Sequence, residues 1–214
     1  MPVRKIPKSF RAVTGRFPSI LNGRCIGYES KLEHDYFLTL EFDRTILRYE
    51  EQPLEVPGVV NGRSVNYIPD CLITYKDTRQ QLLVECKYST ELTDDNEKLQ
   101  IKIARLKEYA SDNNLHFQLI TEKDIPSAVL ANYLRLYRYA KPPLNIAGNR
   151  TRICDVLKAS CCMTLREILQ ALAATPAEQA NFTPAIWHML FAGELETDMN
   201  TPVCLDSVLR KSHG

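Results

Sequence analysis

Residues 67–87 read YIPDCLITYKDTRQQLLVECK, and this stretch decides the fold. Two runs rich in Leu, Ile and Val, at 71–75 and 81–87, are typical of buried β-strands. The polar residues 76–79 lie between the runs and provide a short turn. The pattern therefore predicts an antiparallel hairpin at the centre of a sheet.

Charged side chains lie at the ends of both predicted strands. Asp70 opens the first strand, whereas Glu85 and Lys87 end the second and are two residues apart, so they share one face. Glu85 and Lys87 follow a Leu-Leu-Val run, where an uncompensated charge is costly. Acids and lysines at strand ends are also common in proteins without an active site, so the pattern alone leaves a purely structural role open.

Two carboxylates that converge on one point repel each other unless a cation lies between them. Mg²⁺ prefers such an oxygen-only setting and also binds phosphate oxygens, and Mn²⁺ can substitute for it. A metal held by Asp70 and Glu85 would activate a water for phosphodiester hydrolysis. Lys87 would orient the nucleophile or neutralise the scissile phosphate. The pattern therefore predicts a metal-dependent phosphodiester hydrolase.

The segments around this hairpin predict an α/β fold with a mixed sheet flanked by helices. Residues 44–56 favour an extended segment, and Asn61-Gly62 is typical of the tight turn of a β-hairpin. A strand at 115–121 follows a helix, which predicts that it runs parallel to the strand at 81–87. The predicted helices are 28–42, 94–110 and 126–139.

The C-terminal part has a different pattern, with short helices at 153–158, 164–173 and 184–192 and strand candidates at 193–198 and 203–205. This order is typical of a winged-helix domain, with residues 183–192 as its recognition helix. The predicted domains are a basic N-terminal arm (1–24), an endonuclease domain (25–140), a linker (141–149) and a winged-helix-like domain (150–214).

The 214-residue chain has a net charge of +1, but its charge is unevenly distributed. Six of the 27 basic residues precede the first acid, Glu29, so the remaining 21 face 26 acidic residues and leave a net charge of −5. A basic arm on an acidic body suits phosphate contacts, although a solvated tail has the same composition. The candidate DNA-binding residues are Arg4, Lys5, Lys8, Arg11 and Arg16.

The seven cysteines include no CxxC pair, which favours free thiols over a zinc site; a site at Cys154, Cys161 or Cys162 is the alternative. The four histidines are scattered and support neither a histidine–metal nuclease nor a serine hydrolase. The N-terminus lacks the apolar core of a signal peptide, and no apolar run is long enough to cross a membrane. We therefore expect a cytoplasmic protein.

The order of these motifs resembles the PD-(D/E)xK nuclease superfamily, whose sheet is restriction-endonuclease-like. With the flanks included, the sequence looks like the N-terminal domain of TnsA, the endonuclease subunit of Tn7-like transposons. The segments that carry this resemblance lie between about residues 20 and 140 and are ESKLEHDYFL (29–38), EQP (51–53), YIPD (67–70) and LVECK (83–87).

This resemblance implies a role for each residue of the set. Glu33 would be the helix-borne catalytic acid and a metal ligand beside Asp70 and Glu85, and Lys87 would complete the ExK pair. Family members vary at the position of Glu85. Glu29 lies one helical turn before Glu33 and competes for the same role. Gln52 and Gln100 are outside the set and are interpreted as structural.

The resemblance also implies a partnership. TnsA-like proteins cut the 5′ ends of a transposon in double-stranded DNA, while a TnsB-type transposase processes the 3′ ends and a TnsC-type ATPase regulates the complex. The short C-terminal region suits the compact proteins of CRISPR-associated transposons. The alternatives are a stand-alone PD-(D/E)xK restriction or repair nuclease and an inert DNA-binding adaptor.

Overall fold

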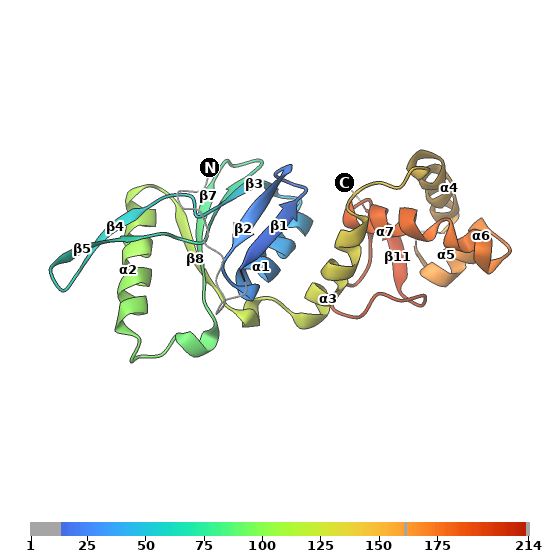
Figure 1. The fold of residues 1–214 in the computed structure, drawn as a ribbon. Coiled ribbons are helices and arrows are strands. Elements are labelled where there is room, and N and C mark those ends of the chain that lie inside the picture. The colour runs from blue at the N-terminus through green and yellow to red at the C-terminus, as the bar shows by residue number, and fades with distance from the viewer. Residues whose placement is uncertain (1–13, 161, 213–214) are drawn as a thin grey trace. The chain divides into compact units, whose positions relative to one another are not determined.

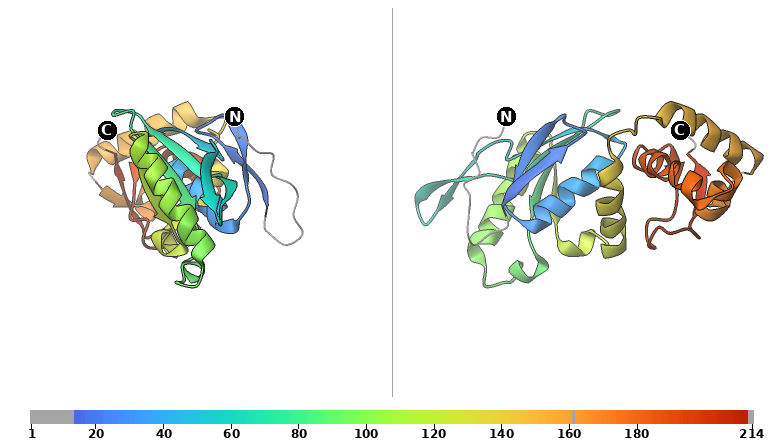
Figure 2. Two further views of the ribbon diagram at one scale, coloured as in Figure 1. Left: turned by 90° about the vertical axis from the view of Figure 1, so that its left-hand side faces the viewer. Right: turned by 45° about the vertical axis from the view of Figure 1, so that its right-hand side comes forward.

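The computed structural model describes residues 14–160 and 162–212, which form two compact units that divide between Ile125 and Pro126 (Figures 1 and 2). The predicted helix at 126–139 therefore belongs to the second unit, and part of the predicted linker is helical. No helix among these residues has the length and apolar character needed to cross a membrane.

The first unit is built on a mixed four-stranded sheet with the order β3-β6-β7-β8. β3 and β6 pair antiparallel, as do β6 and β7, whereas β7 and β8 pair parallel. The predicted mixed α/β sheet, with its parallel pair across a helix, is confirmed and fits a restriction-endonuclease-like fold. The strands are β3 (Ile46–Glu51), β6 (Cys71–Tyr75), β7 (Gln81–Cys86) and β8 (His116–Ile120).

Helices α1 (Lys31–Phe42) and α2 (Glu97–Asp112) pack on opposite faces of this sheet. Leu83 of β7 packs with Leu106 and Ala110 of α2 in one apolar cluster. On the other face, Phe37 of α1 stacks on Tyr49 of β3 with ring centroids 5.6 Å apart. Because alternate residues of a strand face opposite sides, β7 is buried on both. Short 3-10 helices follow β7 (Ser89–Glu91) and β8 (Glu122–Asp124).

The first helix begins later than predicted because the chain before it is extended. β1 (Gly15–Ser19) and β2 (Arg24–Tyr28) form an antiparallel hairpin that the sequence analysis missed. Ser30 then caps α1, since its side chain accepts a hydrogen bond from the backbone N–H of Glu33 at 3.1 Å. Residues 15–19, part of the predicted basic arm, thus belong to the folded body.

The hairpin predicted at Asn61-Gly62 is confirmed. β4 (Val56–Val60) and β5 (Arg63–Tyr67) form a two-stranded ribbon, and both turn residues have positive φ angles, 50° and 74°. Figure 1 shows this ribbon projecting beyond α2. Val56 at its base is buried in the α2 cluster. The last residue of β5, Tyr67, pairs with Val56 at this base, and two residues separate it from Asp70, which directly precedes β6.

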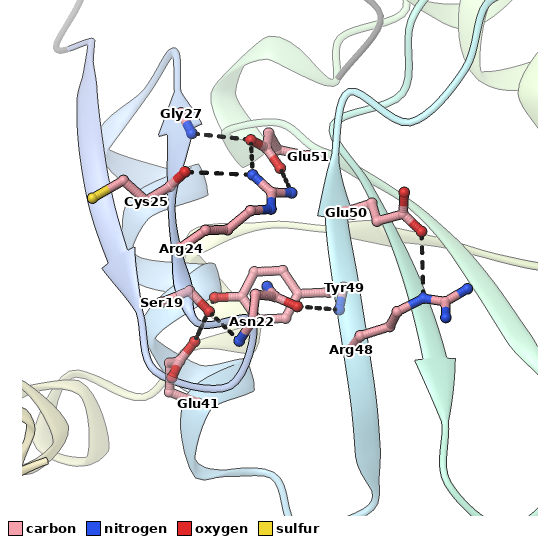
Figure 3. Close-up of polar contacts among 10 residues, drawn as sticks. All are labelled: Ser19, Asn22, Arg24, Cys25, Gly27, Glu41, Arg48, Tyr49, Glu50 and Glu51. Atoms are coloured by element: carbon pink, nitrogen blue, oxygen red, sulfur yellow. Dashed lines mark hydrogen bonds and ion pairs between the residues drawn. The ribbon is translucent and has the colours of Figure 1, made fainter. Parts of the chain in front are cut away.

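A buried polar network fastens the β1–β2 hairpin to the sheet (Figure 3). The Glu41 carboxylate accepts hydrogen bonds from the Ser19 hydroxyl at 2.6 Å and the Tyr49 hydroxyl at 2.7 Å. Arg24 of β2 forms a two-point ion pair with Glu51 of β3, with N–O distances of 2.7 and 2.5 Å. The side chain of Glu51 is 4% exposed, so this pair is largely desolvated on its acidic side.

The second unit combines helices with a small antiparallel sheet of order β10-β11-β9. Asn132 is buried within it and holds the segment before β11, donating to the carbonyls of Met199 and Thr201 and accepting from Val203 N–H. The elements are α3 (Ser127–Leu136), a 3-10 helix (Tyr137–Tyr139), α4 (Ile146–Ala159), β9 (Cys162–Thr164), α5 (Leu165–Leu172), α6 (Pro176–Ala180), α7 (Thr183–Phe191), β10 (Leu195–Glu196) and β11 (Val208–Lys211).

Two details of the predicted winged helix are wrong. The second strand of the predicted wing, at 203–205, is not a strand, and β11 lies further along the chain. Helix α7, the predicted recognition helix, is buried from Ala185 to Phe191, so it cannot present a face to DNA. Its near-continuous apolar sequence makes it the core of the unit, and Trp187 is a core residue as expected. The winged-helix assignment itself remains a proposal.

Replacing Arg24 with Met should lower the free energy of unfolding by about 2 kcal/mol, because it leaves the buried Glu51 carboxylate without its partner. Urea denaturation followed by circular dichroism measures this change. The matched control is Arg48→Met, since Arg48 pairs at 3.5 Å with a partly exposed Glu50 and is itself 55% exposed. That variant should change stability by less than about 0.5 kcal/mol. Equal losses in the two variants would contradict the role given to Arg24.

Candidate active site

A polar cavity of about 420 Å³ opens where β5, β6 and β7 meet the start of α1. Three of the four predicted catalytic residues, Glu33, Asp70 and Lys87, line it. Gln52, which the sequence analysis placed outside the site, and Lys102, which it did not identify, line it as well. The charged and amide side chains around the cavity are Glu29, Glu33, Gln52, Glu91, Asp70, Lys87 and Lys102.

Asp70 is held by the sheet on both sides. Its backbone N–H donates to the Val84 carbonyl at 3.0 Å, and its own carbonyl accepts from the Gln52 N–H at 3.1 Å. The carboxylate accepts from the Cys86 N–H at 2.7 Å. Burial raises the pKa of Asp70 well above its usual range, and the neighbouring carboxylates of Glu85 and Glu33 raise it further. The charges of Lys87 and Lys102 lower the pKa of Asp70 but do not offset these effects.

Glu33 enters the cavity from the first turn of α1, where it is 6% exposed. Its carboxylate accepts a hydrogen bond from the Glu29 N–H at 2.8 Å, which fixes the side chain at the helix N-terminus. Burial raises its pKa, against the lowering effect of that hydrogen bond. Glu29 also lines the cavity. Both acids therefore remain candidates for the helix-borne catalytic acid, and Glu33 is the one whose carboxylate is fixed by a backbone hydrogen bond.

Glu85 is completely buried and does not itself line the cavity. One carboxylate oxygen is in contact with two ammonium groups, that of Lys87 at 3.1 Å and that of Lys102. The other oxygen has no hydrogen-bond partner within the described part of the chain. Burial lowers the pKa of Lys87, but the charges of Asp70 and Glu85 outweigh this effect and raise it, so Lys87 carries a positive charge.

Lys102 is a site residue that the sequence analysis missed. It extends from α2 to Glu85 and lines the same cavity. Its sequence position offered an indication, because Leu99 and Leu106, three residues before it and four after it, are both buried on the same side of the helix. A lysine within an apolar stripe indicates a buried charge that needs a partner.

Gln52 was interpreted as structural, but the structure places it in the cavity beside Asp70. Gln100, the other glutamine given that interpretation, is exposed on α2 and donates to the Thr93 carbonyl. Among the predicted DNA-binding residues, Arg16 is exposed on β1. The other four, Arg4, Lys5, Lys8 and Arg11, lie outside the described residues.

The donor atoms suit a hard divalent cation, although the described residues contain no group of three His, Cys, Asp or Glu side chains arranged to hold a metal ion. Glu33 and Asp70 offer carboxylate oxygens in the cavity, where burial raises the pKa of both and a bound cation would favour their charged forms. Glu85 has an unpartnered oxygen, but its other oxygen is bound to two lysines. Glu33 and Asp70 are therefore the residues best placed to bind a metal.

Residues 43–122 match the family described as "TnsA-like endonuclease N terminal". This part of the chain is similar to the N-terminal domain of TnsA-like endonucleases. The match runs from the residue after α1 to the segment after β8 and includes Asp70, Glu85 and Lys87, whereas Glu33 precedes it. The predicted resemblance to TnsA-like endonucleases is confirmed. A comparison with curated proteins finds no match.

We expect Asp70→Asn to stabilise the metal-free protein at neutral pH by about 1 kcal/mol or more. A raised pKa means that ionising Asp70 costs folding free energy, and the amide removes this cost while keeping an oxygen for the Cys86 N–H. The gain should disappear below about pH 4, where Asp70 is protonated in both states. Urea titrations in EDTA measure it, with Asp77→Asn on the exposed β6–β7 turn as the control. A less stable Asp70→Asn protein at pH 7 would refute this account.

Proposed function

We propose that this chain is the metal-dependent DNA endonuclease of a heteromeric transposase and hydrolyses a phosphodiester at the 5′ ends of its transposon. The observation that carries the proposal is the convergence of Glu33, Asp70 and Lys87 on one cavity within and beside a TnsA-like domain. Glu33 comes from the start of α1, and the other two from the ends of neighbouring strands. Two acids and a lysine at one point suit phosphoryl chemistry.

In this mechanism Asp70 and Glu33 would hold Mg²⁺, or Mn²⁺ in its place, and the ion would polarise the phosphate and acidify a bound water. Glu33 lines the cavity, where the Glu29 N–H fixes its carboxylate, and it is placed to accept the proton of the attacking water. The water oxygen bonds to phosphorus while the bond to the leaving sugar oxygen breaks. Lys87 remains charged at neutral pH and would neutralise the scissile phosphate.

Glu85 would act indirectly, by holding the two lysines in place. Because it is fully buried and paired, it fixes the ammonium groups of Lys87 and Lys102 beside the cavity. Its second carboxylate oxygen is unpartnered, but Glu85 is completely buried and does not line the cavity. We therefore assign Glu85 a positioning role in the state described here, and reserve ligation for Asp70 and Glu33.

The partners of this proposal are transposon-end DNA, a TnsB-type transposase and a TnsC-type ATPase. The second unit is the candidate for binding DNA or one of these proteins, and the winged-helix interpretation belongs to this proposal. Its helix α5 buries four leucine and isoleucine side chains and exposes the opposite face, unlike α7. The origin of the chain in a CRISPR-associated transposon is a further part of the proposal.

The competing enzyme is a stand-alone PD-(D/E)xK nuclease, and partner dependence separates the two. A transposase subunit should cut labelled transposon-end DNA only when its transposase is present, whereas a stand-alone nuclease should cut with Mg²⁺ alone. An inert adaptor should bind the same DNA and cut it under neither condition. One gel assay, run with and without the transposase, distinguishes the three.

In that assay Asp70→Ala and Lys87→Ala should each reduce the rate of strand cleavage by about a hundredfold or more, because each removes a charge from the reacting centre. DNA binding and the circular dichroism spectrum should be unchanged. Asp77→Ala and Lys76→Ala are matched controls on the β6–β7 turn, at the opposite end of the two strands. Full cleavage by both site variants would eliminate the proposed active site.

Metal binding can be tested without cleavage. Mg²⁺ at about a hundredfold excess over its Kd should stabilise the wild-type protein by about 2.7 kcal/mol, since the folded site binds it and the unfolded chain does not. The stabilisation should be lost in Asp70→Ala and retained in Asp77→Ala. Thermal unfolding with increasing Mg²⁺ gives this result directly, and an Asp70→Ala protein that still responds fully would place the metal elsewhere.

A further inference from the structure

Gln52 combines two features that rarely occur together. Its φ angle is +43°, a left-handed backbone conformation that costs free energy in a residue other than glycine. The described part of the chain contains three other non-glycine residues with positive φ, Asn61, Arg79 and Asn114, and all three lie on exposed turns. Gln52 is 6% exposed. Its conformation therefore cannot be explained by an ordinary surface turn.

The following residue increases the cost. Gln52 precedes Pro53, and the proline ring favours extended backbone with a negative φ in the residue before it, which Gln52 does not adopt. The conformation is maintained by the Gln52 N–H, which donates to the Asp70 carbonyl just beyond the last pair of the β3–β6 ladder. The turn thereby ends β3 and brings the glutamine side chain to the same cavity as Asp70.

The side chain of Gln52 lacks a hydrogen-bond partner. The carboxamide oxygen of Gln52 is buried and has no hydrogen-bond donor among the described residues. The hydroxyl of Tyr67, which lines the same cavity, is buried and equally without a partner. Leaving a buried polar atom unpaired is costly, and such atoms in native proteins indicate a ligand or an ordered water.

The chemistry of the cavity identifies the missing donor. Once a cation holds them ionised, Glu33 and Asp70 can only accept hydrogen bonds, so they cannot satisfy the oxygen of Gln52. The ammonium groups of Lys87 and Lys102 are directed at Glu85, and the Tyr67 hydroxyl makes no hydrogen bond to the carboxamide. A water molecule has two hydrogens and can donate one to the carboxamide and the other to Glu33. A water held in this way has its proton directed at the carboxylate that receives it and its lone pairs turned away from both acceptors.

We propose that Gln52 is a further catalytic residue, whose carboxamide oxygen accepts a hydrogen bond from the attacking water and orients it for the phosphate. This inference rests on the proposed nuclease function and adds to it a residue outside the acid–acid–lysine set. The backbone conformation at Gln52 is retained because it places the acceptor, at a cost to stability.

The test compares three substitutions in the cleavage assay with transposase and transposon-end DNA. Gln52→Met keeps the side-chain length but removes the acceptor, so the single-turnover rate should fall by about a hundredfold. Gln52→Glu keeps an acceptor oxygen and should recover at least a tenth of the wild-type rate. Gln100→Met, a matched change at an exposed glutamine, should leave the rate unchanged. Wild-type rates in Gln52→Met would overturn the inference.

Stability gives an independent readout. Gln52→Gly relieves the positive φ and removes the buried amide, so the thermal unfolding midpoint should rise while cleavage is lost. Arg79→Gly relieves a similar φ of 56° on an exposed turn and should raise the midpoint without affecting cleavage. A Gln52→Gly protein that unfolds below the wild type would make Gln52 a structural residue and overturn the proposal.

Two further measurements separate this inference from its alternatives. The stabilisation by Mg²⁺ should be equal in wild type and Gln52→Met, because the proposed partner is water; a loss of that response would make Gln52 a metal ligand and refute the assignment. DNA affinity, measured by fluorescence anisotropy in Ca²⁺, should also be equal, and a weaker affinity would make it a DNA contact. If the wild type itself fails to cut with its transposase, the nuclease proposal fails. If the wild type cuts, Asp70→Ala does not, and Gln52→Met cuts at the full rate, only the role proposed for Gln52 fails.

Discussion

The burial of Glu85 is the constraint on which the rest of the first unit depends. A carboxylate without solvent exposure is strongly destabilising unless cations and hydrogen bonds compensate it. Lys87 supplies one ammonium group from the residue after β7, and Lys102 supplies the other from α2. The second contact requires α2 to lie across β7 in one register, and the Leu83–Leu106 cluster one turn away maintains that register. The acid therefore links the crossover helix to the sheet as well as to the cavity.

The cavity beside Glu85 also gathers more carboxylates than the two lysines can neutralise. Asp70 and Glu33 lie at the cavity with raised pKa values, although their backbone hydrogen bonds favour the charged form. The fold tolerates this because the strand ends and the start of α1 are held independently, by the sheet ladder, by the Ser30 cap and by the polar network around Glu41. Stability is thus concentrated around the cavity and reduced within it, as expected of a site prepared to bind a cation and a phosphate.

The sequence was sufficient to predict what depends on short-range spacing. Asp70, Glu85 and Lys87 belong to one hairpin, so their proximity follows from strand periodicity, and the parallel β7–β8 pair follows from the intervening helix. Glu33 was identified by resemblance alone, because only the tertiary packing of α1 on the sheet brings it to the same cavity as Asp70. Gln52 could not be predicted, because neither the sign of its φ nor its bond to Asp70 is encoded in a local pattern. Helix α7 was misinterpreted because a continuous apolar run was taken for a surface helix, although it fits a buried one better.

The two lysines on Glu85 also bear on how such sites diverge over evolutionary time. One ammonium group comes from the strand and the other from the helix, yet both reach the same carboxylate oxygen. A descendant that lost Lys87 would still carry a cation at this acid, and selection could then refine the helical position instead. The positive charge at this acid thus comes from two elements, and the helical lysine offers a starting point from which the role of the strand-end lysine could be rebuilt. Searches for distant relatives that insist on a lysine two residues after the acid would pass over such descendants.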